Sequence, residues 1–145
     1  MSEETTFWDT VDALRESRRR YAREAYGFVV AALGETVRAM PEERAADPRR
    51  RHLSGGELLG GVVALARREF GPLAPTVFRE WGVHASEDVG EIVFELVRAG
   101  QLSARPEDTM DDFRAGFDLE AELRRAAEGG PPPAGGAGPR RAPAA

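Results

Sequence analysis

The chain has 145 residues, of which 41% are hydrophobic, and carries a formal net charge of −5 at pH 7. It has no cysteine, which excludes disulfides, thiolate nucleophiles and cysteine-ligated metal sites. No apolar run approaches the roughly 20 residues that a membrane span needs, and residues 1–6 lack the basic-then-apolar order of a secretion signal. We therefore expect a single cytoplasmic domain without membrane contact.

Two amphipathic patterns occupy the first forty residues. Phe7, Trp8, Val11 and Leu14 recur at helical spacing, and a longer apolar stripe runs from Tyr21 to Met40. The run Arg18–Arg20 separates the two stripes, so the segment is either one long helix or two helices broken near Ser17. Pro41 ends the pattern, and residues 42–51 form a polar connection that includes Arg49–Arg51.

The clearest folding signals lie between Ser54 and Leu102. Ser54 and Glu57 have the spacing of a capping box, and an apolar stripe follows to Phe70, where Gly71 and a proline end the predicted helix. Gly60 and Gly61 inside this helix are unfavourable for helix formation, which indicates a closely packed neighbour there.

Two further helices are predicted after this one. The shorter runs from Leu73 to Trp81 with Leu73 on its buried side, and Gly82 provides a left-handed stop. Ser86 is expected to cap the next helix, whose buried stripe contains Val89, Ile92, Val93, Leu96 and Val97. The order helix, short helix, helix is typical of a helix-turn-helix core.

The rest of the chain completes the predicted fold. Residues 101–105 and 112–117 are candidate strands of a short β-hairpin, which would make the domain winged-helix-like. Asp118 can cap a last helix over residues 119–128 with Leu119 and Leu123 facing inward. We thus expect a mainly α, compact domain over residues 1–128 and a disordered tail rich in Gly, Pro and Ala over residues 129–145.

Several local strings resemble a known protein family. They are Ala25-Tyr26 with Phe28-Val29, Glu57-Leu58-Leu59, Phe70-Gly71-Pro72-Leu73-Ala74, Trp81-Gly82-Val83, Glu87-Asp88-Val89-Gly90-Glu91-Ile92 and Phe117-Asp118. In this order, across roughly residues 20–120, the chain is similar to the "Minf" family of small conserved hypothetical proteins of planctomycetes, verrucomicrobia and relatives. The resemblance implies a bacterial cytosolic protein, and it supplies no activity or site residue.

No residue pattern in the sequence indicates a catalytic, cofactor or metal site. His52 and His84 are the only histidines, and each is more readily explained as a structural loop residue than as a general base. The glycine pairs match neither nucleotide-binding spacing nor a P-loop, and the chain has no lysine. We therefore name no catalytic residue and expect no cofactor.

The charge distribution bears on the choice of partner. Residues 86–128 carry twelve acids and five arginines, and Glu87, Asp88, Glu91 and Glu95 are expected on the exposed face of the third helix. Such a face would repel DNA, because neutralising phosphates supplies most of the affinity of a DNA-binding protein. Nucleic acid is therefore the less favoured partner.

The sequence favours a non-enzymatic protein-protein interaction module, with a protein partner or a second copy of the chain. Its candidate interaction surface combines the acidic helix face with the second arginine cluster and the histidine after it: Glu87, Asp88, Glu91, Glu95, Arg49, Arg50, Arg51 and His52. The alternative is a nucleic-acid-associated regulator that binds through its arginine clusters and not through its third helix.

Overall fold

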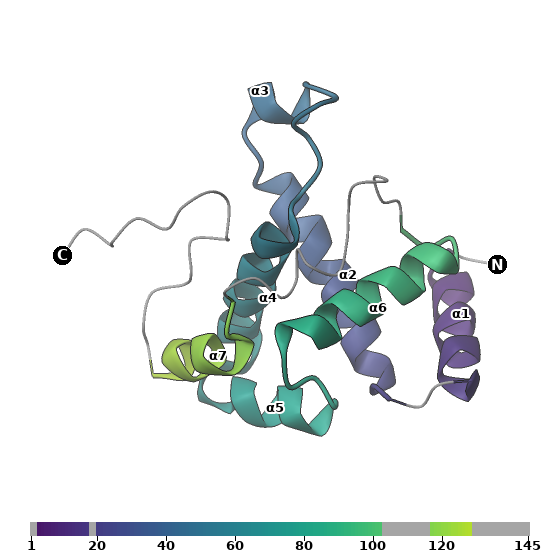
Figure 1. Cartoon of the computed structure of the whole chain (residues 1–145), viewed down its shortest axis with the longest axis vertical. Coiled ribbons are helices and arrows are strands. Elements are labelled where there is room, and N and C mark those ends of the chain that lie inside the picture. Colours follow the sequence, from purple (N-terminus) through teal and green to yellow (C-terminus); the bar gives the residue numbers. More distant parts are fainter. Residues whose placement is uncertain (1–2, 18–19, 103–116, 129–145) are drawn as a thin grey trace.

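Helices make up most of the computed structural model, which describes residues 3–17, 20–102 and 117–128 (Figure 1). Their bounds are α1 Glu3–Ser17, α2 Arg23–Arg38, α3 Glu42–Ala45, α4 Gly55–Phe70, α5 Ala74–Glu80, α6 Ser86–Arg98 and α7 Leu119–Ala127, with a 3-10 turn η1 at Gly71–Leu73. These ranges contain no strand. Most of the predicted hairpin, and the whole predicted tail, lie outside the described residues, so the winged-helix layout has no strand to support it here.

The first amphipathic stretch forms two helices. α1 ends at Ser17 and α2 begins at Arg23, which resolves the alternative between one long helix and two. α1 packs back on α2, where the Trp8 ring fills the space that a side chain at Gly27 would need: a Cβ there would lie 2.7 Å from the ring. The Arg23 guanidinium lies 4.3 Å from the centroid of the same ring.

The centre of the domain is the pair α2 and α4. Both helices bury apolar stripes, including Val29 on α2 and Leu59 and Val62 on α4. The prediction of close packing at the glycines of α4 is confirmed at Gly61, where a Cβ would lie only 2.0 Å from Thr36 Oγ1 on α2. The absence of a side chain at position 61 thus sets the distance between the two helices.

The capping box at the start of α4 is confirmed. Ser54 Oγ accepts from the Glu57 N–H at 3.0 Å, and a Glu57 carboxylate oxygen accepts from the Ser54 N–H at 2.9 Å. The helix ends as predicted, with Gly71 at a φ of 52°.

The predicted helix from Leu73 to Trp81 differs from the observed one. Gly71–Leu73 forms the 3-10 turn η1, and only Ala74–Glu80 is α-helical. Leu73 is the N-cap of α5, and five residues at about 100° per residue place it roughly 140° around the axis from the buried Phe78. Leu73 is 63% exposed, and its predicted inward orientation is wrong. Gly82 has the predicted left-handed φ, at 82°.

An aromatic cluster joins α2, α4 and α5. Phe28 packs with Phe70, Phe78 and Trp81, with ring centroids 5.3 to 5.5 Å apart. The backbone adds a further link, since Ala22 N–H donates to the Trp81 carbonyl at 3.0 Å. These contacts attach the short helix α5 to the central pair.

α6 and α7 complete the core, and the start of α6 corrects a prediction. Ala85, not Ser86, occupies the N-cap position. The Asp88 carboxylate reaches back to accept from the N–H groups of His84 and Ala85 at 2.8 and 3.0 Å, so a side chain in the first turn, and not Ser86, fixes the start of the helix. Asp118 caps α7 as predicted, accepting from the Ala121 N–H at 3.1 Å.

The order helix, short helix, helix is confirmed for α4, α5 and α6. Within the described ranges, no helix is long and apolar enough to cross a bilayer.

Candidate functional site

An arm made of α3 and the turn after it extends from one end of the molecule, beyond the ends of α2 and α4 (Figure 1). We define the arm as residues 39–53. α3 has no buried residue, and most of the arm is exposed. The arm begins at Ala39, the C-cap of α2, and ends just before Ser54, the N-cap of α4, so both of its ends are fixed by the central helix pair.

Arg44 holds the arm in place through hydrogen bonds to Glu57 and to two backbone carbonyls, and we call this set of contacts the brace. The Arg44 guanidinium donates to both carboxylate oxygens of Glu57, at 2.5 and 2.8 Å. It also donates to two backbone carbonyls of the turn, from Nε to Arg50 at 2.6 Å and from Nη2 to His52 at 3.1 Å. A planar guanidinium suits such a set of bonds, because its donors are held in a fixed fork. Arg44 therefore ties the turn to the first residues of α4.

The electrostatics of this pair favour the charged form of both partners. The hydrogen bond from Arg44, with a smaller effect of the Ser54 N–H bond, holds the pKa of the Glu57 carboxyl below its ordinary value, although burial acts to raise it. The same hydrogen bond raises the pKa of Arg44. The brace is thus an ionised pair at neutral pH.

The turn that Arg44 holds carries three consecutive exposed arginines. Asp47 organises it: the Asp47 carbonyl accepts from Arg50 and Arg51 N–H at 2.9 and 3.0 Å, and its carboxylate accepts from Arg49 N–H at 2.9 Å. These bonds form a single helical turn. We call residues 47–52 the arginine loop. The predicted candidates Arg49, Arg50 and Arg51 all lie exposed on it, and the half-buried His52 closes it.

The other arginine cluster is Arg18–Arg20, and Arg20 has a different role from the arginines of the loop. Arg20 Nη1 lies 3.0 Å from Glu91 and Nη2 lies 3.4 Å from Asp88, both on α6. Arg18 and Arg19 lie outside the described residues. Arg20 therefore pairs with the acids of α6.

The predicted acidic face of the third helix is not an exposed surface. Asp88 and Glu95 are buried, with 6% and 3% exposure, and the Glu91 side chain is 28% exposed and paired with Arg20. Glu87 is half-buried. The prediction of four exposed acids is wrong because α6 turns this side toward the segment before α2 and toward α2 itself, which supply polar partners.

Those partners are two tyrosines. The Tyr21 hydroxyl lies 2.9 Å from Asp88 and 2.6 Å from Glu91, and the Tyr26 hydroxyl donates to Glu95 at 2.5 Å. Burial, together with the two neighbouring carboxyl groups, raises the pKa of Tyr21 above its ordinary value. The carboxyl groups are thus part of the packing between α6 and the start of α2.

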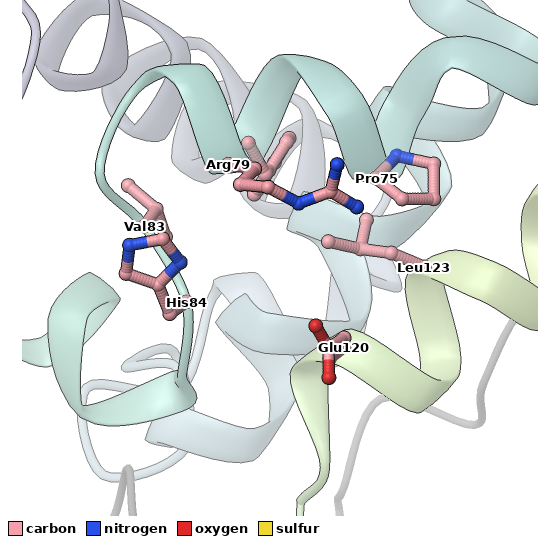
Figure 2. Close-up of a pocket in the computed structure, with 7 residues that line it drawn as sticks. Pro75, Arg79, Val83, His84, Glu120 and Leu123 are labelled. Carbon is pink, nitrogen blue, oxygen red and sulfur yellow. The ribbon is translucent and has the colours of Figure 1, made fainter.

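A small hollow lies between α5, the following turn and α7. Figure 2 shows Pro75, Val83 and Leu123 around it with the polar groups of Arg79, His84 and Glu120. Its volume is about 20 Å³, which accommodates roughly one water molecule and not an organic substrate. Among the residues that the structure describes, no group of three or more His, Asp or Glu side chains could hold a metal ion.

Sequence reasoning missed the brace and the tyrosine partners. Arg44 is thirteen residues from Glu57, and Tyr21 is 67 residues from Asp88, so no helical spacing connects either pair. The capping-box signal identified Glu57 as a helix-start residue without indicating its second partner. A buried tyrosine in an apolar stripe gives no sign that its hydroxyl meets a carboxyl group.

Comparison of the chain with protein-family models, curated proteins and solved structures finds no match. The resemblance to the "Minf" family is not supported by a family model and stays a prediction.

Proposed function

We propose that the protein is a non-enzymatic interaction module whose binding element is the arginine loop. Its first candidate partner is a protein with an acidic surface. The proposal also treats α4, α5 and α6 as a helix-turn-helix-derived scaffold and expects it to act in the cytoplasm, where a chain without cysteine needs no oxidising conditions.

The observation that carries this proposal is the brace. Arg44 uses its guanidinium on Glu57 and on two carbonyls of the loop, so it fixes the backbone that carries Arg49, Arg50 and Arg51. A loop held in one conformation before binding loses less conformational entropy when a partner is bound. An exposed, preorganised row of three cations is suited to recognition and contributes little to the core.

The test is affinity co-purification of the tagged full chain from its host, compared with the variant Arg49→Glu/Arg50→Glu/Arg51→Glu. We expect a protein that is retained by the parent chain after nuclease treatment and lost from the variant. The control is Arg79→Glu/Arg98→Glu/Arg124→Glu, which changes the charge equally at exposed positions on α5, α6 and α7. Equal loss of the partner from both variants would show a net-charge effect and reject the loop.

A second candidate function, a nucleic-acid-associated regulator, is favoured by the burial of the α6 acids. The sequence argued against nucleic acid because four acids were expected to face it. Asp88 and Glu95 are inside the protein and Glu91 is paired with Arg20, so these acids do not form the exposed face that a nucleic acid was expected to meet. In the co-purification this function would appear as partners that disappear on nuclease treatment.

A further inference from the structure

We infer that the arginine loop binds the phosphate backbone of duplex DNA, without reading its sequence, and that Arg44 is the residue that positions the loop. The inference rests on the second candidate of the proposed function, the nucleic-acid-associated regulator, because it uses the same loop and specifies duplex DNA as the partner.

The first support is the way the three arginines are spaced. Arg50 and Arg51 N–H both donate to the Asp47 carbonyl, which makes the loop one helical turn. Consecutive residues of such a turn are about 100 to 120° apart around its axis, so three arginines in a row are directed to different sides. A flat acidic surface would meet one or two of them. A groove bordered by phosphates on both sides can meet all three.

The dimensions agree with a groove. A helical turn with its side chains is roughly 10 to 12 Å wide, and the major groove of B-form DNA is about 12 Å wide. The loop is on the arm that extends past the ends of α2 and α4, away from the other labelled helices (Figure 1). It can therefore approach the duplex before the body of the protein does.

The local charges are also suitable. Glu57 is paired with Arg44, and the Asp47 carboxylate, within the loop, accepts from the Arg49 N–H, a bond that does not neutralise it. Glu42 and Glu43 on α3 are exposed and oppose binding, so the affinity should be modest. Three phosphate contacts fall in the range of non-specific binding, with a Kd on the order of 10⁻⁴ to 10⁻⁶ M.

The side chains of the loop offer no reader of adenine. The commonest readers of adenine are asparagine and glutamine, and the chain has no asparagine and a single glutamine, Gln101. Gln101 follows α6 and lies near Thr10 of α1, at 3.4 Å, not on the arm. Arginine can also read guanine, but three adjacent cations directed to different sides suit the phosphates that border the groove. The proposal therefore assigns the loop arginines to phosphates, which position a protein without specifying sequence.

The experiment measures binding of the purified full chain to a labelled 20-base-pair duplex of mixed sequence at several salt concentrations. For three phosphates, log K should fall with log salt at a slope of about −2.7, which is about a forty-fold loss between 50 and 200 mM salt. A duplex of different sequence should bind within about two-fold. Each of Arg49→Ala, Arg50→Ala and Arg51→Ala should reduce the slope by about one.

Two variants distinguish the effect of the loop arginines on binding from the effects of net charge and of the brace. Arg79→Ala/Arg98→Ala/Arg124→Ala removes three cations from other exposed positions and should leave the slope unchanged. Arg44→Ala should weaken duplex binding more than any single loop variant while leaving the phosphate-contacting arginines in place. Equal binding by the parent chain and the triple-alanine loop variant would overturn the inference.

Other probes distinguish failure of this inference from failure of the proposed function. Poly-glutamate that binds through the loop while the duplex does not would overturn the DNA inference and keep the interaction module. Equal affinity for single-stranded DNA of the same length would overturn the groove geometry. If neither probe binds, the DNA inference is rejected, and the co-purification with the glutamate variant decides the proposed function separately.

Discussion

Gly61 is the residue on which the spacing of the central helices depends. Substitution Gly61→Ala places a Cβ 2.0 Å from Thr36 Oγ1 and 3.3 Å from Thr36 Cβ, so α2 and α4 must separate or Thr36 must rotate. Overpacking of this kind typically costs about 1 to 3 kcal/mol of unfolding free energy, and we expect that loss in urea titrations.

Two variants check this explanation. Thr36→Ala combined with Gly61→Ala should recover part of the loss, because it removes the clashing hydroxyl. Gly34→Ala on α2 is the matched helical control: its Cβ would meet only the flexible end of Arg38, at 3.3 Å. It should be neutral or stabilising by up to about 1 kcal/mol through helix propensity. A destabilisation by Gly34→Ala equal to that of Gly61→Ala would contradict a local clash.

We predict that a buried tyrosine hydroxyl bonded to α6 contributes more to the free energy of unfolding than the exposed ion pair on the same helix. Tyr26→Phe removes the 2.5 Å hydrogen bond to Glu95, which is only 3% exposed, and should cost roughly 1 to 3 kcal/mol. Arg20→Ala removes the half-exposed pair with Glu91 and should cost less than about 1 kcal/mol. Thermal unfolding of both variants checks the order, and the reverse order would mean that the surface pair holds α6.

At the scale of the helix, α4 links stability to pH through Glu57. Its carboxyl has a depressed pKa in the folded protein, so its contribution is fully present above the ordinary value of about 4.3 and is lost as the pH falls through the folded value. We expect Glu57→Gln to lower the free energy of unfolding at neutral pH, and the gap to the parent chain to close in acid.

Urea titrations between pH 7 and pH 3 measure that gap. Glu80→Gln, an exposed substitution at the end of α5, serves as the control and should show a much smaller gap. A gap for Glu57→Gln that stays constant down to pH 3 would mean that lost packing, and not lost charge, causes the effect.

The start and stop signals of most helices could be predicted from the sequence, because they are local. Ser54, Gly71, Gly82 and Asp118 act within a few residues of their own position, and each has the predicted role. The direction in which side chains face was less predictable, and Leu73, the N-cap of α5, is exposed although it was expected on the buried side.

The candidate site was predicted only in part, for a different reason. A run of three arginines is visible in any sequence, and exposure follows from its charge. The burial of Asp88 and Glu95 depends on hydroxyl groups 67 and 69 residues away in the chain, which only the packing of the start of α2 against α6 brings close. Long-range polar pairs of this kind leave no periodic signal.

At the scale of the whole molecule, the brace and the capping box share one side chain. Glu57 accepts the Ser54 N–H that closes the cap of α4, and the same carboxylate holds Arg44. DNA binding at the loop and fraying of the first turn of α4 are therefore thermodynamically linked. Binding should stabilise the first turn, and loss of the first turn should weaken binding by the same free energy. Amide hydrogens at the start of α4 should exchange more slowly when duplex DNA is bound.

The converse is a loss of affinity caused by a residue that carries no charge. Ser54→Ala should weaken duplex binding although all three loop arginines remain, while Asp118→Ala, which removes the cap of α7, should leave binding unchanged. Binding titrations of the two variants against the parent chain test this. An equal loss of affinity in both variants would mean that general destabilisation is responsible. A loss only in Ser54→Ala would mean that the cap of α4 controls the affinity of the loop for DNA.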